Sequence, residues 1–185
     1  MIKIESLKDY ISELNKDDFF SLAFNIYETI EFLSSDYPKH KEWYFKKQLP
    51  AINTGERNIL FVRNPHNYNE IIAMACLKKT EDEKKICTIY VKDEYRGLGI
   101  GTKIIDASLN WLGTTKPLIT ISEYKLDMFN WLIEKYNWQV TDKVKGLYND
   151  KYKEYCFNGT ILKKKELEEK LVRILNRRIK DLKRQ

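Results

Sequence analysis

The chain has 185 residues, of which 43% are hydrophobic and 32% are charged, and its formal net charge is +6. A chain of this length and composition should fold unaided around one core. No apolar run approaches the roughly 18–20 residues that span a bilayer, and the first residues lack the apolar stretch of a signal peptide, so we expect a cytoplasmic protein without membrane contact.

The cysteine and histidine content argues against a disulfide framework and against a zinc site. The three cysteines, Cys76, Cys87 and Cys156, form no CxxC pair, and His40 and His66 are the only histidines. An odd number of cysteines without paired spacing is typical of reduced thiols. We therefore expect no metal ligands in this chain.

The first half of the chain is predicted to form a short strand, two helices and three strands. Residues 1–6 alternate apolar and polar side chains, as in an edge strand. A helix starts behind Asn15, with apolar residues mostly at every third or fourth position, and Tyr37-Pro38 ends it. Residues 39–49 form a second helix that stops before Pro50. Three strands follow at residues 58–62, 70–78 and 85–91, separated by polar turns at 64–69 and 80–83.

The second half alternates helices and strands. Residues 104–112 keep helical spacing, and Gly113 suits a helix C-cap. The remaining predicted elements are a buried strand at 117–121, an amphipathic helix at 126–138 and closing strands at 140–144 and 154–157.

A glycine-rich loop, Arg96-Gly97-Leu98-Gly99-Ile100-Gly101, lies between the strand 85–91 and a helix. Gly101 is followed by Thr102-Lys103, so the loop lacks the Gly-Lys-Ser/Thr end of a P-loop. Its alternating glycines also differ from the GxGxxG spacing of a dinucleotide site. A strand, loop and helix in this order bring backbone N–H groups to the positive end of the helix, where a pyrophosphate can bind.

The loop matches the Arg/Gln-x-x-Gly-x-Gly/Ala motif of GNAT acetyltransferases, with Arg96, Gly99 and Gly101 in the defining places. The order of elements over residues 1–158 resembles the GNAT fold, and residues 37–159 look like short stand-alone bacterial and phage members. The resemblance implies an α/β (α+β) fold with a central mixed, mostly antiparallel sheet flanked by helices, and acetyl-CoA as the cofactor. The cofactor-binding residues that it implies are Ile89, Tyr90 and Val91, which would pair with pantetheine, and Arg96, Gly97, Leu98, Gly99, Ile100, Gly101 and Thr102 around the pyrophosphate.

The implied activity is acetyl transfer from acetyl-CoA to a primary amine of a small molecule, a protein or an aminoacyl-tRNA. A break in the family pattern favours an alternative, a non-catalytic module that binds CoA or nucleic acid. Many members have a helix reading Asn-x-x-Ala-x-x-Leu-Tyr-x-x-x-Gly-Phe, whose Tyr is the usual general acid. Aligning Asn137-Trp138 with its Gly-Phe end puts Ile133 at the position of that Tyr.

Four residues remain candidates for catalysis. Tyr136 lies three residues beyond Ile133, and Tyr148 could approach from a closing segment. Some members have a glutamate base on the strand before the loop, but Lys84-Lys85 occupies that region here. Glu123 and Glu154 are the carboxylates close to where the strands of this fold separate. Each candidate could equally be a packing tyrosine or a surface carboxylate.

Two further regions carry predictions about partners. As in the family, the first two helices would shape the acceptor pocket, with Trp43, Tyr44 and Phe45 as either wall or core residues. From Ile161 onward, ten Lys or Arg residues exceed four Asp or Glu residues by six, which equals the net charge of the whole chain. We therefore divide the chain into an acetyltransferase domain, residues 1–160, and a basic C-terminal segment, residues 161–185.

The C-terminal segment is predicted to form an amphipathic helix from Leu167. Its apolar side would dock on the domain or on a second copy of the chain, giving a homodimer. Its basic side is either a solvated face or a contact for an acidic protein or a nucleic acid. The residues that would make this contact are Lys170, Arg173, Arg177, Lys180 and Arg184.

Overall fold

The computed structural model describes residues 2–161. Its α-helices are α1 (Lys16–Ile30), α2 (His40–Trp43), α3 (Ile100–Leu112) and α4 (Leu126–Lys135). Its strands are β1 (Glu5–Ser6), β2 (Arg57–Asn64), β3 (Asn67–Lys79), β4 (Lys84–Val91), β5 (Leu118–Ser122), β6 (Val140–Lys145) and β7 (Lys153–Phe157). A 3-10 turn at Glu31–Ser35 follows α1, and a π-helical turn at Tyr44–Gln48 follows α2.

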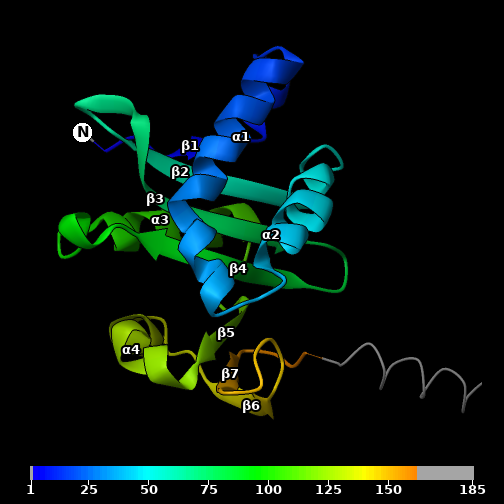
Figure 1. Cartoon of the computed structure of the whole chain (residues 1–185). Helices are drawn as coiled ribbons and strands as arrows, with labels where there is room; N and C mark the ends of the chain where they lie inside the picture. Colours follow the sequence, from blue (N-terminus) through cyan, green and yellow to red (C-terminus); the bar gives the residue numbers. More distant parts are fainter. Residues whose placement is uncertain (1, 162–185) are drawn as a thin grey trace, which may run out of the picture.

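All of these strands join one sheet in the order β1-β2-β3-β4-β5-β7-β6. β4 and β5 run parallel, and every other neighbouring pair is antiparallel. The strands β5, β6 and β7 lie with α4 beyond β4, at the lower end of the view in Figure 1. The architecture confirms the predicted fold, a mixed and mostly antiparallel sheet flanked by helices.

Alternation along β2 separates two hydrophobic cores. Ile59 and Phe61 pack with α1 in one core, whereas Leu60 and Val62 pack with α3 in the other. Because successive side chains of a strand point to opposite faces, α1 and α2 cover one face of the sheet and α3 covers the other (Figure 1). The helices on both faces therefore fix the position of the central strands, including β4.

The sheet opens between β4 and β5. These two strands pair only at Lys85 with Leu118 and at Ile86 with Ile119. On the other side of β4, Thr88 and Ile86 pair with successive residues of β3, which leaves Cys87 as an extra, bulged residue. A bulge bends a strand and increases its twist. β4 therefore leaves β5 directly after Ile86, and residues 87–91 pair with no described strand on that side.

The predicted order of elements is confirmed, and the capping residues are where they were expected. The Asn15 side chain accepts a hydrogen bond from the N–H of Asp18 at 2.9 Å, and thereby caps α1. Gly113 ends α3 with a φ of 67°, a left-handed conformation that glycine adopts without steric cost.

Three predicted boundaries are wrong for local reasons. α1 ends at Ile30 rather than near Tyr37-Pro38, because the chain tightens into the 3-10 turn Glu31–Ser35. α4 stops at Lys135 because Asn137 takes a φ of 48°, which breaks the helix and which asparagine tolerates better than most residues. The turn predicted at 64–69 is shorter, since pairing between β2 and β3 continues to Asn64 and Asn67.

No helix within residues 2–161 is long and apolar enough to cross a bilayer. The helix predicted from Leu167, with Lys170, Arg173, Arg177, Lys180 and Arg184, lies outside the described residues. The boundary at residue 160, the homodimer and the nucleic-acid contact therefore stay predictions.

Candidate functional site

The glycine loop connects β4 to α3 with backbone conformations that favour glycine. Gly97 has a φ of 77° and Gly99 a φ of 76°. A Cβ in this left-handed region costs roughly 1–2 kcal/mol. Gly99 is the N-cap of α3, and no described side chain caps that helix. The first N–H groups of α3 can therefore bind an anion at the positive end of the helix dipole.

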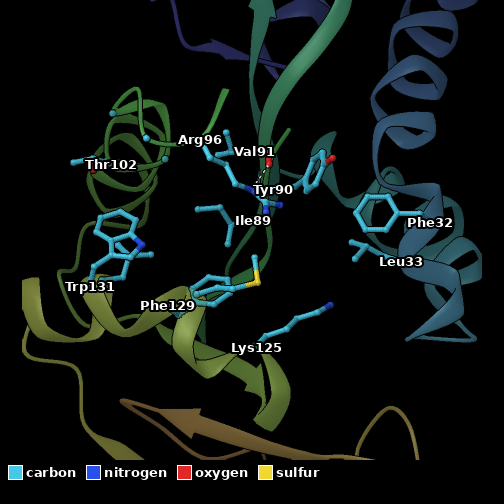
Figure 2. Close-up of a pocket in the computed structure, with 15 residues that line it drawn as sticks. Phe32, Leu33, Ile89, Tyr90, Val91, Arg96, Thr102, Lys125, Phe129 and Trp131 are labelled. Atoms are coloured by element: carbon cyan, nitrogen blue, oxygen red, sulfur yellow. Dashed lines mark hydrogen bonds between the residues drawn. The ribbon is translucent and has the colours of Figure 1, made fainter. Parts of the chain in front are cut away.

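The loop borders a cavity of about 650 Å³, which we call the glycine-loop cavity. One wall is formed by α4, with Phe129 and Trp131, and the opposite wall by Phe32 and Leu33 of the turn after α1 (Figure 2). Ile89 lies between the two walls in the same view. The further lining residues are Tyr90, Val91, Arg96, Gly97, Gly99, Gly101, Thr102, Lys125, Met128 and Leu132.

The glycine-loop cavity combines an anion-binding end with the open edge of β4. Backbone groups of residues 87–91 face the opening left by β5 and can hydrogen-bond to amide groups of an extended ligand. Arg96 connects the glycine loop to the end of β4, because its Nε donates to the carbonyl of Val91 at 3.1 Å. Its guanidinium also pairs with Asp93 at 2.7 Å. These residues fit a ligand that has a diphosphate at one end and an amide-containing chain at the other.

A second cavity, of about 620 Å³, lies on the other side of the opening. We call it the basic cavity, because six Lys or Arg residues and only one carboxylate, Glu83, line it among the described residues. Trp43 and Tyr148 add aromatic walls. The two cavities share four lining residues, Leu33, Ile89, Lys125 and Phe129, so they meet at the opening between β4 and β5.

Glu154 and Ser122 are register partners on β7 and β5, next to the opening. Ser122 lines the basic cavity, whereas Glu154 is only 3% exposed. Within residues 2–161, neither Glu154 Oε2 nor Ser122 Oγ has a hydrogen-bond partner. Burial raises the pKa of Glu154 to about 7, although the charges of Lys125 and Lys85 act in the opposite direction. A carboxyl group with this pKa can accept and release protons near neutral pH.

The other predicted catalytic residues lie in three different places. Tyr148 lines the basic cavity, and its hydroxyl accepts a hydrogen bond from Lys85 Nζ at 3.1 Å. Tyr136 lines neither cavity, because its hydroxyl bonds to Asp106 on α3 and its ring stacks on Trp138. Glu123 is exposed outside both cavities and accepts from the N–H of Lys153 at 3.2 Å. The structure therefore places Tyr148 in the wall of the basic cavity and Glu154 directly behind that wall, next to Ser122, whereas Tyr136 and Glu123 lie away from both cavities.

Most of the predicted cofactor-binding residues line the glycine-loop cavity, with two exceptions. Leu98 is 64% exposed and does not line it, and Ile100, the first residue of α3, is 3% exposed and packs in the core beneath that helix. Of the three aromatic candidates on the second helix, Trp43 lines the basic cavity. Tyr44 is fully buried and donates to the carbonyl of Ala23, and Phe45 packs against the same core.

Sequence reasoning missed much of the basic cavity. The sequence pattern indicates Lys85 only as part of the basic pair in the place of a glutamate base, and it does not indicate Arg57, Ser122 or Lys125. The missed residues come from β2, β4, β5 and the turn before α4, so no sequence spacing connects them. The only available signal was the basic pair Lys84-Lys85 on a strand otherwise made of apolar and small residues.

His40 is a buried histidine in the wall of the basic cavity. It is 6% exposed, its ring lies between Tyr27 and Trp43, and neither ring nitrogen has a hydrogen-bond partner among the described residues. Burial lowers its pKa to about 4. His40 is therefore neutral in the folded protein at neutral pH, while an unfolded chain binds a proton below about pH 6.5.

This difference predicts a loss of stability in acid. Between about pH 6.5 and 4 the unfolded chain holds the extra proton, so the stability contributed by His40 falls with falling pH, by about 2 kcal/mol at pH 5. The variant His40→Phe keeps a ring between Tyr27 and Trp43 but cannot titrate. Urea unfolding at pH 7.5 and pH 5 measures the free energy of unfolding, and its decrease between these pH values should be smaller for His40→Phe than for the wild type. Equal losses would contradict the assignment, and Glu154 cancels from the comparison because both proteins contain it.

Comparison with known proteins agrees with this geometry. The model of the Acetyltransferase (GNAT) family matches residues 11–117, more than half of the chain. The matched span contains α1, β2 to β4, the glycine loop and α3. A search of curated proteins finds no match.

Solved structures share the fold at low sequence identity. A putative acetyltransferase of the GNAT family from Desulfovibrio desulfuricans has a TM-score of 0.59 and 11% identity, over 85% of this chain and 97% of that chain. Arabidopsis thaliana NAA60, in complex with acetyl-CoA, has a TM-score of 0.56 and 15% identity, over 85% of this chain and 97% of that chain. Nourseothricin acetyltransferase has a TM-score of 0.50 and 10% identity, and the match covers 56% of this chain and 65% of that chain, less than two thirds of its length.

At these identities the structural neighbours show the fold, and the family match shows the relationship. The glycine loop, the open edge of β4 and the match over residues 11–117 lead to the same conclusion. The chain belongs to the acetyltransferase (GNAT) family, whose members are acyltransferases that use acetyl-CoA.

Proposed function

We propose that this protein transfers the acetyl group of acetyl-CoA to a primary amine. The observation that carries the proposal is the meeting of two cavities at the opening between β4 and β5. One cavity has the anion-binding loop, and the other is lined by Ser122 beside the buried carboxyl of Glu154. A donor and an acceptor held on the two sides of this opening would be aligned for direct transfer.

The chain's own groups account for cofactor binding in the glycine-loop cavity. Backbone N–H groups of Gly97, Gly99, Gly101 and Thr102 bind the pyrophosphate, and the dipole of α3 favours its negative charge. The free backbone edge at Ile89–Val91 hydrogen-bonds to the pantetheine amides. These amides take the place that a neighbouring strand would occupy, because β5 pairs with β4 only at Lys85 and Ile86. The aromatic side chains of α4 close the cavity from the other side.

The transfer step needs a base for the amine proton. Bound acetyl-CoA supplies the thioester, whose carbonyl carbon bonds to the amine nitrogen while the carbon–sulfur bond breaks and the thiolate leaves. Glu154 takes the proton that the amine nitrogen loses, through the Ser122 hydroxyl or one water in the basic cavity. The thiolate takes up one proton, from Tyr148 or from water. A free thiol has a pKa of about 8.5, so this second proton transfer needs little assistance.

Acetyl-CoA binding and turnover can be tested separately. Acetyl-CoA at 100 times its Kd should stabilise the protein by about 2.7 kcal/mol, which raises the melting temperature by several degrees. NAD, which has a diphosphate but no pantetheine, is the matched control and should stabilise less. When acetyl-CoA is incubated with the protein and a panel of amines, we expect release of the CoA thiol and an acetylated amine that mass spectrometry detects.

Two outcomes would overturn the proposal. No thermal stabilisation by CoA or acetyl-CoA would contradict cofactor binding at the loop. Stabilisation without thiol release from any small amine, peptide or aminoacyl-tRNA would favour the alternative of a non-catalytic CoA-binding module.

A further inference from the structure

Three cations that line the basic cavity lie in one row across the sheet. Arg57 on β2 pairs with Lys78 on β3, and Lys78 pairs with Lys85 on β4. Residues directly opposite one another in antiparallel strands project from the same face, and like charges in such positions are destabilising. All three residues line the basic cavity. The row therefore places positive charge in the cavity at a cost to the fold.

Only part of this charge is neutralised by the protein. Lys78 Nζ pairs with Glu83 at 2.8 Å, and Lys125 Nζ, elsewhere in the cavity, pairs with Asp36 at 2.9 Å. In the part of the chain that the structure describes, neither Arg57 nor Lys85 has a carboxylate within 4.0 Å. Two cations of the row thus form no direct ion pair among the described residues, and Glu83, which pairs with Lys78, acts on Lys85 only from a greater distance.

Of the two cations, Lys85 has the larger energetic cost without an anion, because it is buried. It is only 9% exposed, and its Nζ donates a hydrogen bond to a neutral group, the Tyr148 hydroxyl. A buried charge is costly unless it is paired. Burial disfavours the ammonium form, but Tyr148, Cys87 and, more weakly, Glu83 together raise the pKa of Lys85, so the group is charged at neutral pH.

Arg57 is held in place by neutral contacts. Its Nη1 donates to Gln48 Oε1 at 2.8 Å and contacts Cys87 Sγ at 3.6 Å, and its guanidinium lies 5.8 Å from the ring centroid of Trp43. These contacts fix the planar guanidinium and leave further N–H donors for a ligand, which suits bidentate binding of a carboxylate or phosphate.

We propose that Arg57 and Lys85 bind an anionic group of the acceptor, so that the acceptor is a small primary amine that also carries a carboxylate or a phosphate. This inference rests on the proposed acetyltransferase function. A cavity of about 620 Å³ is of the size that takes a small molecule. The anion supplies the charge that Arg57 and Lys85 lack, while the amine lies toward Ser122 and the shared residue Ile89. Polycationic amines are repelled by the same row.

A binding experiment tests the anion site without turnover. With the protein saturated with CoA, so that the glycine loop is filled, inorganic phosphate is titrated by calorimetry. We expect saturable binding that weakens about tenfold in Arg57→Gln and in Lys85→Met. Lys84→Gln is the matched control, because Lys84 precedes Lys85 on β4 but is exposed and bonds to the carbonyl of Gly113. Its phosphate affinity should equal that of the wild type.

Matched pairs of amines test the acceptor class. Phosphoethanolamine is compared with ethanolamine, and γ-aminobutyrate with its amide, by release of the CoA thiol. The anionic member should have a kcat/KM at least tenfold higher in one or both pairs. Arg57→Gln should remove this preference by raising KM for the anionic amine. Arg57→Lys keeps a positive charge and should restore part of the preference. These two Arg57 variants test the anion site even if Lys85→Met fails to fold.

The proposal is overturned if phosphate binding is absent, or is the same in Arg57→Gln, Arg57→Lys and wild type. It is also overturned if the neutral member of each pair, or a polycationic amine, is the better acceptor. Failure of CoA to bind would instead contradict the proposed function, and the Arg57-dependent binding of phosphate would still be measurable.

Discussion

Replacing Glu154 by Gln is expected to lower kcat by roughly 10²–10⁴-fold, the usual contribution of a general base. Glu154 is buried beside Ser122, with one carboxylate oxygen that has no partner among the described residues. The Gln side chain has nearly the same shape but cannot take a proton from the amine. The measurement is the initial rate of thiol release at saturating acetyl-CoA, and KM for acetyl-CoA should change little because Glu154 does not line the glycine-loop cavity.

The pH dependence should change in the same variant. A carboxylate acts as a base only when it is deprotonated. Because the pKa of Glu154 is about 7, kcat of the wild type should rise with pH through about 7. That inflection should be absent in Glu154→Gln. A raised carboxyl pKa also means that the folded state holds a proton which the unfolded chain releases above about pH 4.5. The stability contributed by protonated Glu154 is thus lost as pH rises from about 4.5 through 7, and Glu154→Gln should melt roughly a few degrees higher than the wild type at pH 8.

Glu123→Gln is the matched control, since Glu123 is an exposed carboxylate outside both cavities. It should leave the pH profile and the melting temperature close to those of the wild type. A kcat within about threefold of the wild type in Glu154→Gln would contradict the assignment of Glu154 as the base, because lost general base catalysis costs more than this.

Replacing Gly99 by Ala is expected to raise the Kd for acetyl-CoA by about tenfold or more. Gly99 has a φ of 76°, where a Cβ costs roughly 1–2 kcal/mol, and the strain is relieved only if the loop moves its N–H groups. A shift of these groups misaligns several hydrogen bonds to the pyrophosphate together. Titration calorimetry with CoA measures the change, and the melting temperature of the free protein reports any loss of fold.

Gly101→Ala is the matched comparison within the same loop. Gly101 is in the first turn of α3 and has no positive φ. A Cβ built there would lie 3.7 Å from Val91 and 3.8 Å from Trp131, which are ordinary contact distances. Gly101→Ala should therefore lose much less affinity than Gly99→Ala. Equal losses would contradict the assignment, because they would show that backbone conformation does not govern the loop. The expected smaller loss for Gly101→Ala would explain why the family motif accepts alanine only at its last position.

The glycine-loop cavity of the candidate site was largely predictable from the sequence, because most of its lining is local. The residues from Ile89 to Thr102 are contiguous, so the strand, the turn and the helix N-terminus that they form follow from their own backbone preferences. The glycine conformations and the cap of α1 by Asn15 are set by neighbours a few residues apart. The walls contributed by Phe32 and Trp131 could not be deduced in this way, since they come from distant segments.

The acceptor side was decided by the tertiary structure. The bulge at Cys87 depends on the pairing of β4 with β3, and it opens the sheet where Lys85, Ser122 and Glu154 gather from three strands. Tyr136 and Glu154 show what the sequence could not decide. Both were candidates for catalysis, but in the folded protein Tyr136 donates a hydrogen bond to Asp106, and Glu154 is buried beside the opening.

The sequence by itself determined the family, the order of elements and the loop that can hold a diphosphate. These properties depend on hydrophobic periodicity and local backbone conformation. Only the tertiary structure decided which charges share a cavity. Register across β2, β3 and β4 brings Arg57 and Lys85 into one row, and packing buries the Lys85 ammonium, which makes an anionic ligand favourable there.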